Sequence, residues 1–394
     1  MPAIRLKPAR KKSVRNRHPW IFSGAIAEVQ GSPQPGSTVD VLSSEGAFLA
    51  RGYYNARSQI RVRILTWDQD EEIVPDFWRD RLQRAMARRK ALADDPQTTA
   101  YRLAFAESDG LPGLIVDVYG DWLVLQSLTA GIERWKPTLV ELLMELLEPR
   151  GIYERSDAAV RAREGLRPTT GPLAGKAPEE ELTILENGLR FRVDVRHGQK
   201  TGFYLDQRES RCKIGPRCRG REVLDAFSYT GGFGVYALSH GAKSVTSLDA
   251  SGQALQMAED NVRLNGLCGR SEYMEGNAFQ VLRGLCSEGR QFDLVILDPP
   301  KFAFSRAQVT RATRGYKDIN MLGMRLLRPG GILCTFSCSG LVSPDLFQKV
   351  LFGASLDVER ELRIVERLAQ TSDHPVLLTF PESGYLKGLV CLVE

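Results

Sequence analysis

Two short motifs carry the side chains best suited to covalent chemistry. Asp298-Pro-Pro-Lys301 follows an apolar run over residues 292–297, and Phe336-Ser-Cys338-Ser-Gly340 follows another over residues 331–336. The prolines fix an extended turn, which should project Asp298 beyond the end of its strand. Because strands of a parallel sheet end at one edge, we expect Asp298 and Cys338 to reach the same substrate.

The chemistry expected of this pair is methylation of a pyrimidine carbon. C5 of cytosine is a poor nucleophile, so a thiolate must first add to C6 and generate an enamine that attacks a methyl donor. We predict Cys338 as that nucleophile and Asp298, in its protonated form, as a hydrogen-bond donor to N3. The base that removes the C5 proton is not identifiable from the sequence. A purely structural, buried Cys338 is the alternative, and it is the interpretation we give to Cys334 and Cys391.

A glycine-rich segment before these motifs predicts a cofactor site. Val223-Leu-Asp-Ala-Phe-Ser-Tyr-Thr-Gly-Gly-Phe-Gly234 ends one strand and opens a helix, and Asp249 ends the next strand, where its carboxylate can accept from two ribose hydroxyls. The aromatic residues leave less room for a pyrophosphate than for a nucleoside with an amino-acid tail, which favours S-adenosylmethionine. The amide of Asn277 could contact the adenine. The predicted cofactor-binding residues here are Asp225, Phe227, Tyr229, Thr230, Gly231, Asp249, Ala250, Asn277, Ala278 and Asp298.

Two other functions remain open. Methyltransferases that act on exocyclic amino groups commonly have an aromatic residue after the two prolines, whereas this chain has Lys301, and their chemistry has no use for Cys338. The second alternative is a ribosome-assembly factor that binds RNA and keeps the fold without turnover. Loss of Asp249, Asp298 or Cys338 would indicate that function, and all three are present.

The elements that must position these residues form an alternating pattern. Strands expected at 222–226, 244–248, 292–297 and 331–336, with helices between them, predict a doubly wound parallel sheet. Before it, short strands within 21–65 predict a small β-barrel. A helix over 76–93, a hairpin over 113–128 and a helix over 133–147 predict a central α+β domain, and the Pro/Gly-rich stretch 167–178 is expected to be a loop or linker. The predicted domains are 1–72, 73–185 and 186–394.

Composition limits the compartment and the chemistry. Of 394 residues, 43% are apolar and 26% charged, as in typical soluble multidomain proteins, and no apolar run is long enough for a membrane span or a secretory signal. We therefore expect a cytoplasmic protein with no membrane partner. Seven cysteines without a CxxC pair and only four histidines predict reduced thiols and no metal.

Basic residues are concentrated at the start of the chain. Residues 1–20 contain no acidic residue, and arginines at 51, 61 and 63 alternate with apolar residues, so one barrel face is expected to present guanidinium groups. A basic arm followed by a basic barrel favours RNA through counterion release, although a solvated surface is about equally compatible with the arm alone. The predicted substrate-binding residues are Arg5, Lys7, Arg10, Lys11, Lys12, Arg15, Arg17, Pro299, Pro300 and Lys301.

Taken together, the motifs resemble the bacterial 23S rRNA cytosine-5 methyltransferase I family over essentially the whole chain. His18-Pro-Trp-Ile-Phe-Ser-Gly24 resembles the family's PUA opening, and residues 198–208 resemble its cofactor-proximal loop. The resemblance implies a PUA-like β-barrel, a central α+β domain and a Rossmann-like class I methyltransferase domain. It also implies S-adenosylmethionine as cofactor, with Lys200, Phe203 and Arg208 contributing to its site, and one cytosine of 23S rRNA, free or in the large ribosomal subunit, as target. Asn277 departs from the acidic residue expected there, and a homodimer is left open.

Overall fold

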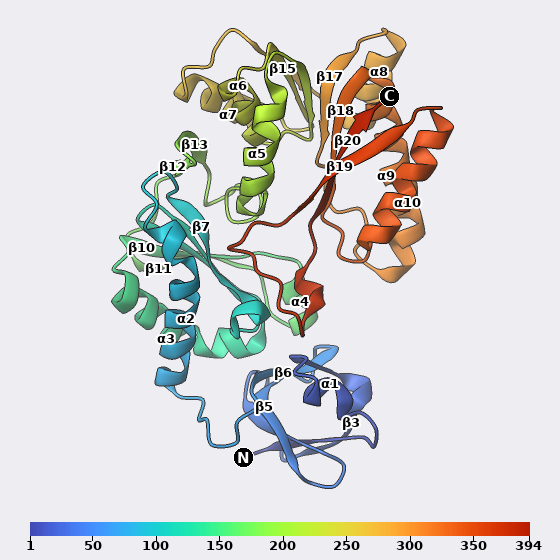
Figure 1. Ribbon diagram of the computed structural model, residues 1–394. Helices are drawn as coiled ribbons and strands as arrows, with labels where there is room; N and C mark the ends of the chain where they lie inside the picture. Colours follow the sequence, from blue (N-terminus) through green and yellow to red (C-terminus); the bar gives the residue numbers. More distant parts are fainter. The chain divides into compact units, whose positions relative to one another are not determined.

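The computed structural model describes residues 1–394, which form two compact units. Unit 1 consists of Met1–Ile184, Val193–Leu205 and Ser372–Ser383, and unit 2 of Leu185–Arg192, Asp206–Thr371 and Gly384–Glu394. Figure 1 shows the chain coloured from the N-terminus to the C-terminus, in which the red segment at 372–383 is the part of unit 1 that comes last in the sequence. The predicted limits of three domains stay a prediction, because the two units are each assembled from separate stretches of the chain and do not test those limits.

The first part of unit 1 is a six-stranded sheet in the order β2-β6-β5-β4-β1-β3. Its core consists of alternating buried residues, such as Val39 and Val41 on one strand and Val62 and Ile64 on another. Its elements are β1 (Ala3–Leu6), α1 (Lys12–Arg15), β2 (Trp20–Phe22), η1 (Ser23–Ala25), β3 (Ile26–Gln30), β4 (Thr38–Leu42), β5 (Phe48–Tyr54) and β6 (Ile60–Thr66).

The start of the basic segment belongs to this sheet, because Ala3–Leu6 forms β1. β1 pairs with β3 antiparallel and with β4 in parallel, so the predicted basic arm was wrong as a structural description. Arg5 and Lys7 gave no apolar alternation long enough to signal a strand. Short strands are present within 21–65 as expected, and η1 separates the first two of them, β2 and β3.

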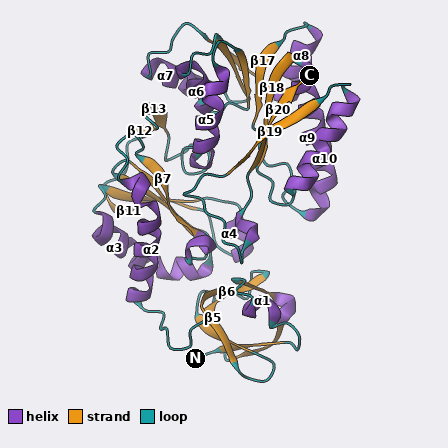
Figure 2. Cartoon of the chain, in the orientation of Figure 1, coloured by secondary structure: helices purple, strands orange, loops and turns teal.

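The second part of unit 1 is a five-stranded sheet in the order β11-β10-β9-β8-β7, covered by helices α2 and α3. The expected helices and hairpin are confirmed. Figure 2 shows α2 and α3 in purple beside these strands. The elements are α2 (Pro75–Ala93), β7 (Ala100–Phe105), η2 (Ala106–Asp109), β8 (Leu114–Tyr119), β9 (Trp122–Ser127), α3 (Ala130–Leu147), β10 (Gly151–Ser156), α4 (Val160–Glu164) and β11 (Thr169–Gly175).

The prediction of a loop or linker over 167–178 was wrong, because this stretch contains β11. This strand pairs antiparallel with β10 at the edge of the sheet, with Pro172 opposite Tyr153. An edge strand tolerates proline because one side of its backbone makes no ladder hydrogen bonds. The Pro and Gly residues therefore identified an edge rather than a loop.

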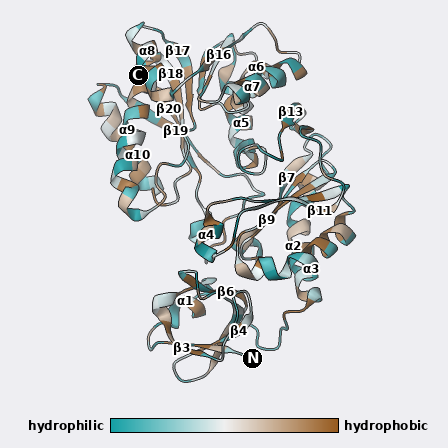
Figure 3. Ribbon diagram, turned by 180° about the vertical axis from the view of Figure 1, so that it is seen from behind, coloured by the Kyte–Doolittle hydropathy of each residue, from teal (hydrophilic) through white to brown (hydrophobic).

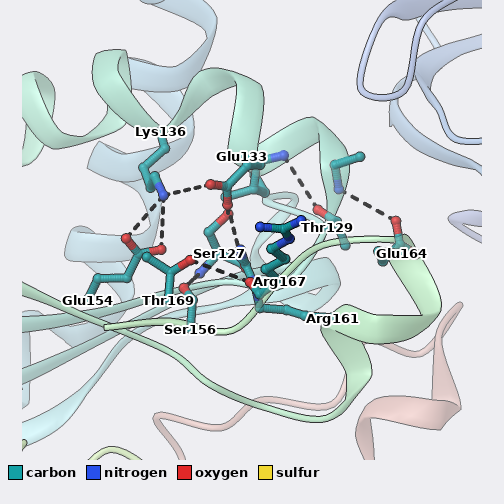
Figure 4. Close-up of polar contacts among 12 residues, drawn as sticks. Ser127, Thr129, Glu133, Lys136, Glu154, Ser156, Arg161, Glu164, Arg167 and Thr169 are labelled. Carbon is teal, nitrogen blue, oxygen red and sulfur yellow. Dashed lines mark hydrogen bonds and ion pairs between the residues drawn. The ribbon is translucent and has the colours of Figure 1, made fainter. Parts of the chain in front are cut away.

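Buried and half-buried charges join the helices of this part to the sheet (Figure 4). Lys136 on α3 bonds Glu154 on β10, with Nζ and Oε1 3.0 Å apart, and Arg161 on α4 pairs with Glu133 at 2.9 Å. Ser127 at the end of β9 also donates to Glu133, at 2.7 Å. Because each charge is paired, loss of one partner would leave an uncompensated buried charge. The network thus fixes α3 and α4 against the strands.

Unit 2 is built on a seven-stranded sheet in the order β16-β15-β14-β17-β18-β20-β19. The strands are β14 (Glu222–Ala226), β15 (Ser244–Asp249), β16 (Ser271–Glu275), β17 (Phe292–Leu297), β18 (Leu327–Ser337), β19 (Leu362–Ala369) and β20 (Lys387–Val393). β14 to β18 are parallel as expected, whereas β20 runs antiparallel between β18 and β19. Figure 3 shows hydrophobic colours on the central strands, whose side chains form the main core.

Helices cover both faces of this sheet, with α5 to α7 on one side and α8 to α10 on the other (Figure 2). They are α5 (Arg208–Ile214), α6 (Gly232–Ser239), α7 (Gly252–Leu264), α8 (Ala278–Ser287), α9 (Val309–Arg325) and α10 (Pro344–Asp357). The remaining elements are β12 (Leu182–Glu186), β13 (Leu189–Val193), η3 (Leu205–Gln207), η4 (Gly215–Cys218), η5 (Arg306–Gln308) and η6 (Pro381–Ser383). None of the helices is both long and apolar enough to cross a membrane.

Candidate active site

The loop between β14 and α6 is held in a strained conformation. Phe227, Tyr229 and Gly231 all have positive φ angles, of 65°, 48° and 76°. Each such angle costs a non-glycine residue about 1–3 kcal/mol, and strain of this kind is concentrated at functional sites. Glycine is required at 231 for a second reason, because a Cβ there would lie 2.8 Å from Cβ of Ala258 on α7. Strain and close packing together make this loop a candidate for a functional role.

Three buried polar atoms in and beside this loop have no hydrogen-bond partner: Oδ1 of Asp225, Oγ of Ser228 and Oγ1 of Thr230. Buried polar groups in native proteins are almost always paired, so a cluster of three indicates groups intended for a ligand. One carboxylate and two hydroxyls can accept from an ammonium and bond a carboxylate. These are the groups at the amino-acid end of S-adenosylmethionine, so the residues present fit this cofactor.

The electrostatics of Asp225 agree with a cationic ligand. Burial, followed by the nearby Asp298 carboxylate, raises the pKa of Asp225 from 3.8 to about 7, although Oδ2 accepts a hydrogen bond from the backbone N–H of Gly234 at 3.1 Å. A positive charge beside Asp225 would favour its ionised form. The sulfonium and ammonium groups of the cofactor would both act in this direction.

Asp249 lies at the end of β15, beside the same loop. Its Oδ2 accepts from the backbone N–H of Tyr229 at 2.9 Å, and its Oδ1 accepts from that of Ser251 at 3.0 Å. Each carboxylate oxygen has a further lone pair, so both can also accept from hydroxyl groups. The carboxylate is thus already oriented for a diol, with Ala250 next to it.

Asn277 is the N-cap of α8 and immediately precedes Ala278. Its Oδ1 accepts from the backbone N–H of Phe279 at 3.0 Å, which is the usual way that an N-cap satisfies the first turn of a helix. The amide oxygen is therefore occupied by the cap. The NH₂ group is the part of this side chain that can contact an adenine.

The two motifs of the proposed catalytic pair meet at one edge of the sheet. β17 and β18 are parallel neighbours, and the thiol of Cys338 lies 3.9 Å from the Pro299 carbonyl oxygen, within the Asp298-Pro-Pro-Lys301 turn. Oδ2 of Asp298 accepts from Nε2 of Gln207 at 2.9 Å. Pro299 is buried, whereas Pro300 and Lys301 are exposed. The thiol and the acidic turn are thus assembled where a substrate could contact both.

Sequence reasoning missed two residues of this region, Gln207 and Lys387. Gln207 fixes the Asp298 carboxyl group through its side-chain amide. Lys387 is buried at the start of β20, and its Nζ donates to the carbonyl oxygens of Ser339 at 2.7 Å and Val342 at 2.8 Å. The sequence feature that could have identified Lys387 is its position directly before the apolar run Gly388–Val393, where a lysine is unusual.

Lys200, Phe203 and Arg208, which were expected near the cofactor, belong to different units. Lys200 and Phe203 belong to unit 1, where the backbone N–H of Phe203 donates to the Tyr119 hydroxyl at 3.2 Å. Arg208 belongs to unit 2 and is buried at the start of α5, donating to Oγ1 of Thr371 at 2.8 Å. The contribution of these three residues to cofactor binding remains a prediction.

The basic surface is smaller than the strands suggested. Arg51 is paired with Asp40 at 2.8 Å, and Arg63 with Glu107 at 2.6 Å, so the prediction that these arginines present free guanidinium groups was wrong. Within residues 1–20, Arg5 and Lys11 form ion pairs with Glu28 and Glu45. The exposed basic residues of this segment are Lys7, Arg10, Lys12, Arg15 and Arg17.

The structure shows no cluster of side chains suited to a metal ion. No three His, Cys, Asp or Glu side chains of the chain are grouped so that they could hold a metal ion. The expectation of a metal-free reaction stays a prediction.

Comparison with known proteins defines the class. Residues 163–390 match the S-adenosylmethionine-dependent methyltransferase family, and residues 4–67 match a PUA-like domain. Two solved structures share the fold over 100% of both chains. One, described as a methyltransferase complexed with SAH, has a TM-score of 0.88 at 21% identity, and the other, described as a SAM-dependent methyltransferase from Streptococcus mutans, has 0.86 at 22%. Fold, site and family thus define an S-adenosylmethionine-dependent methyltransferase with an N-terminal PUA-like domain.

Relatives with a much higher sequence identity than these two structures define the family within this class. The protein called ribosomal RNA large subunit methyltransferase I of Shewanella denitrificans is 51% identical over 392 residues, or 99% of each chain. The protein of that name from Aeromonas salmonicida is 49% identical over 388 residues, or 98% of each chain. The chain belongs to the ribosomal RNA large subunit methyltransferase I family.

Proposed function

We propose that this chain transfers a methyl group to C5 of one cytosine in large-subunit ribosomal RNA through a covalent intermediate on Cys338. The RNA substrate is supported by the names of relatives that match almost the whole chain. The target atom is supported by one observation: the Cys338 thiol lies beside the Asp298-Pro-Pro-Lys301 turn, 3.9 Å from the Pro299 carbonyl oxygen. Methylation of an amino nitrogen would need no thiol at that place.

The residues of the β14–α6 loop would hold the cofactor. Asp225, Ser228 and Thr230 offer unpaired polar atoms to its amino-acid end, and Asp249 offers both carboxylate oxygens to its ribose. The bound cofactor supplies an electrophilic methyl group. The contacts of Asn277, Ala250, Ala278, Phe227 and Tyr229 with the nucleoside are part of the same proposal.

The chemistry on the base requires three events from this chain. Cys338 loses its proton, and its sulfur forms a bond to C6, which makes C5 nucleophilic. Asp298, held by Gln207, hydrogen-bonds N3 while electron density collects there. After C5 is methylated, its proton leaves and the C6–sulfur bond breaks, which restores the aromatic ring and the thiol. These steps conserve atoms and require no oxidant or reductant.

RNA contacts would involve the exposed cations of the first 20 residues together with Pro300 and Lys301. Lys7, Arg10, Lys12, Arg15 and Arg17 lie at the surface of the six-stranded part. Cations in this number can displace several counterions from RNA, which strengthens binding most at low salt. We also propose a cytoplasmic location, and the homodimer stays an open prediction.

Trapping of the intermediate tests this function. Ribosomal RNA that contains 5-fluorocytidine has no C5 proton to lose, so the adduct cannot be released after methyl transfer. We expect a covalent protein–RNA complex that requires the cofactor and is absent in Cys338→Ala, while Cys391→Ala, which alters a core thiol, still forms it. A complex of equal yield in Cys338→Ala would exclude the covalent role of this residue.

A further inference from the structure

The burial of Lys387 calls for an explanation. Only 8% of this residue is exposed, and it begins a strand whose other members are apolar. Lysine is rarely buried unless its charge is compensated, because removing an ammonium from water is costly. Its Nζ bonds two backbone carbonyls, and it forms no salt bridge with a carboxylate. Carbonyl dipoles alone compensate a full charge only in part.

The position of Lys387 relates it to Cys338. On the antiparallel pair β18–β20, Lys387 lies opposite Ser337, the residue before Cys338. Its Nζ bonds the carbonyls of Ser339 and Val342, which follow Cys338, so the ammonium spans the turn that carries the thiol. An ammonium has three N–H donors, and these two bonds leave one of them for a further acceptor.

We propose that Lys387 is the positioning residue for the nucleophile: its ammonium fastens the Cys338 turn to β20 and supplies the counter-charge that stabilises the Cys338 thiolate. This inference rests on the proposed function for its purpose, although the ion pair itself can be measured without RNA or cofactor. Lys387 keeps its proton throughout and does not touch the substrate.

The charged and titratable groups around the pair support this arrangement. Burial lowers the pKa of Lys387 from 10.5 to about 8, an effect that a Cys338 thiolate opposes and that Lys301 reinforces. By reciprocity, an attraction that favours the ammonium also favours the thiolate. The Tyr316 hydroxyl bonds Oγ of Ser339 at 3.0 Å on the α9 side, and burial raises the pKa of Tyr316, so it is neutral there. Asp298, just before the Pro299 carbonyl, is the nearby acidic group on the β17 side, and it opposes the thiolate when it is ionised.

The test compares Lys387→Met with Lys387→Arg in the full-length protein. The rate at which iodoacetamide alkylates Cys338 is followed against pH by peptide mass spectrometry, without RNA or cofactor. We expect the midpoint of this profile to rise by about one pH unit or more in Lys387→Met and to stay near wild type in Lys387→Arg. We also expect methylation by Lys387→Met to fall at least tenfold at neutral pH and to recover partly at alkaline pH. An unchanged alkylation midpoint in Lys387→Met would overturn the proposal even if activity were lost.

A second measurement does not depend on the folding of a Lys387 variant. In Cys338→Ser the thiolate is absent, so the pKa of Lys387, read by NMR after selective isotope labelling of lysine, should fall below its wild-type value. An equal pKa in both proteins would contradict the ion pair. A normal pair in a protein that makes no 5-methylcytidine would instead contradict the proposed function, which separates the two failures.

Discussion

Asp225 combines burial, a neighbouring carboxylate and an unpaired oxygen in one side chain. Its pKa of about 7 means that the folded protein without cofactor favours the neutral acid, whereas an unfolded chain ionises this group near 3.8. The folded state then binds more protons than the unfolded state between these values, so this group makes stability fall as pH rises from about 4 to 7. Above pH 7 the cost of an ionised, buried Asp225 is fully present until a cation compensates it.

Asp225→Asn is therefore expected to separate stability from binding. At pH 8 the variant without cofactor should unfold at higher urea concentration than wild type, with a gain of at most about 4 kcal/mol for a shift of this size. Its affinity for S-adenosylmethionine, measured by calorimetry, should fall at least tenfold and lose the increase between pH 6 and 8 that ionisation of Asp225 gives wild type. Asp345→Asn, an exposed control on α10, should change neither quantity. Tighter or unchanged cofactor binding by Asp225→Asn would contradict the assignment.

Residues at strand ends were predictable because their position follows from local pattern. Asp225, Asp249, Asp298 and Cys338 each follow an apolar run, and parallel strands bring such ends to one edge. Lys387 was not predicted from the sequence, because its proposed role depends on pairing between β18 and the antiparallel strand β20, which begins far beyond Cys338 in the sequence. Arg51 and Arg63 were misread because alternation shows which side chains share a face but not whether acidic residues from elsewhere cover that face.

At the scale of an element, the β14–α6 loop carries most of the expected binding. Three of its residues have positive φ angles, and Gly231 has no space for a Cβ. Gly220 provides a matched control, since its φ of 69° is similar but no atom lies within 4 Å of a Cβ built there.

Gly231→Ala should cost more than Gly220→Ala. Both variants lose the freedom to adopt positive φ, worth about 1 kcal/mol, but only Gly231→Ala meets Ala258, which adds roughly 1–3 kcal/mol. Urea denaturation should show this difference, and cofactor affinity should fall in Gly231→Ala alone. Equal stability and equal affinity in the two variants would show that the close packing of the loop on α7 is unimportant.

Elements were predicted well where long periodic patterns dominate. The helix at Pro75–Ala93 and the hairpin of β8 and β9 were recognised from sequence because each is a local structure. β1 and β11 were missed, since four residues in the first case and a proline in the second give no alternation to detect. The antiparallel insertion of β20 could not be predicted either, because strand order is set by long-range pairing.

At the scale of the whole molecule, RNA binding by the first 70 residues cannot be tested cleanly by deletion. Arg63 on β6 forms buried ion pairs with Glu107 of η2 and Glu164 of α4. Removal of the six-stranded part would take away Arg63, the cation that pairs with both carboxylates, and would uncover the surface around them, so a change in RNA binding could not be separated from a change in the remaining chain. Surface charge changes avoid this problem.

The double variant Lys12→Glu/Arg15→Glu changes two exposed residues of α1 and should leave stability and cofactor affinity near wild type. RNA affinity should fall, and the slope of log K against log salt should decrease by roughly one for each phosphate that the variant no longer neutralises. Lys349→Glu, an exposed change on α10, is the control for net charge. An equal fall of affinity and slope in that control would mean that α1 has no specific part in RNA binding.

The identity of the methylated nucleoside tests the proposed reaction most directly. Purified protein is incubated with methyl-tritiated S-adenosylmethionine and 23S ribosomal RNA that lacks its native methylation, free or within the large subunit, and the RNA is digested to nucleosides. Label in 5-methylcytidine is the result that the Cys338 and Asp298 arrangement predicts. Label in an N-methylated nucleoside would contradict it and return Cys338 to a packing role, and no label on either form of the RNA would favour a non-catalytic RNA-binding protein.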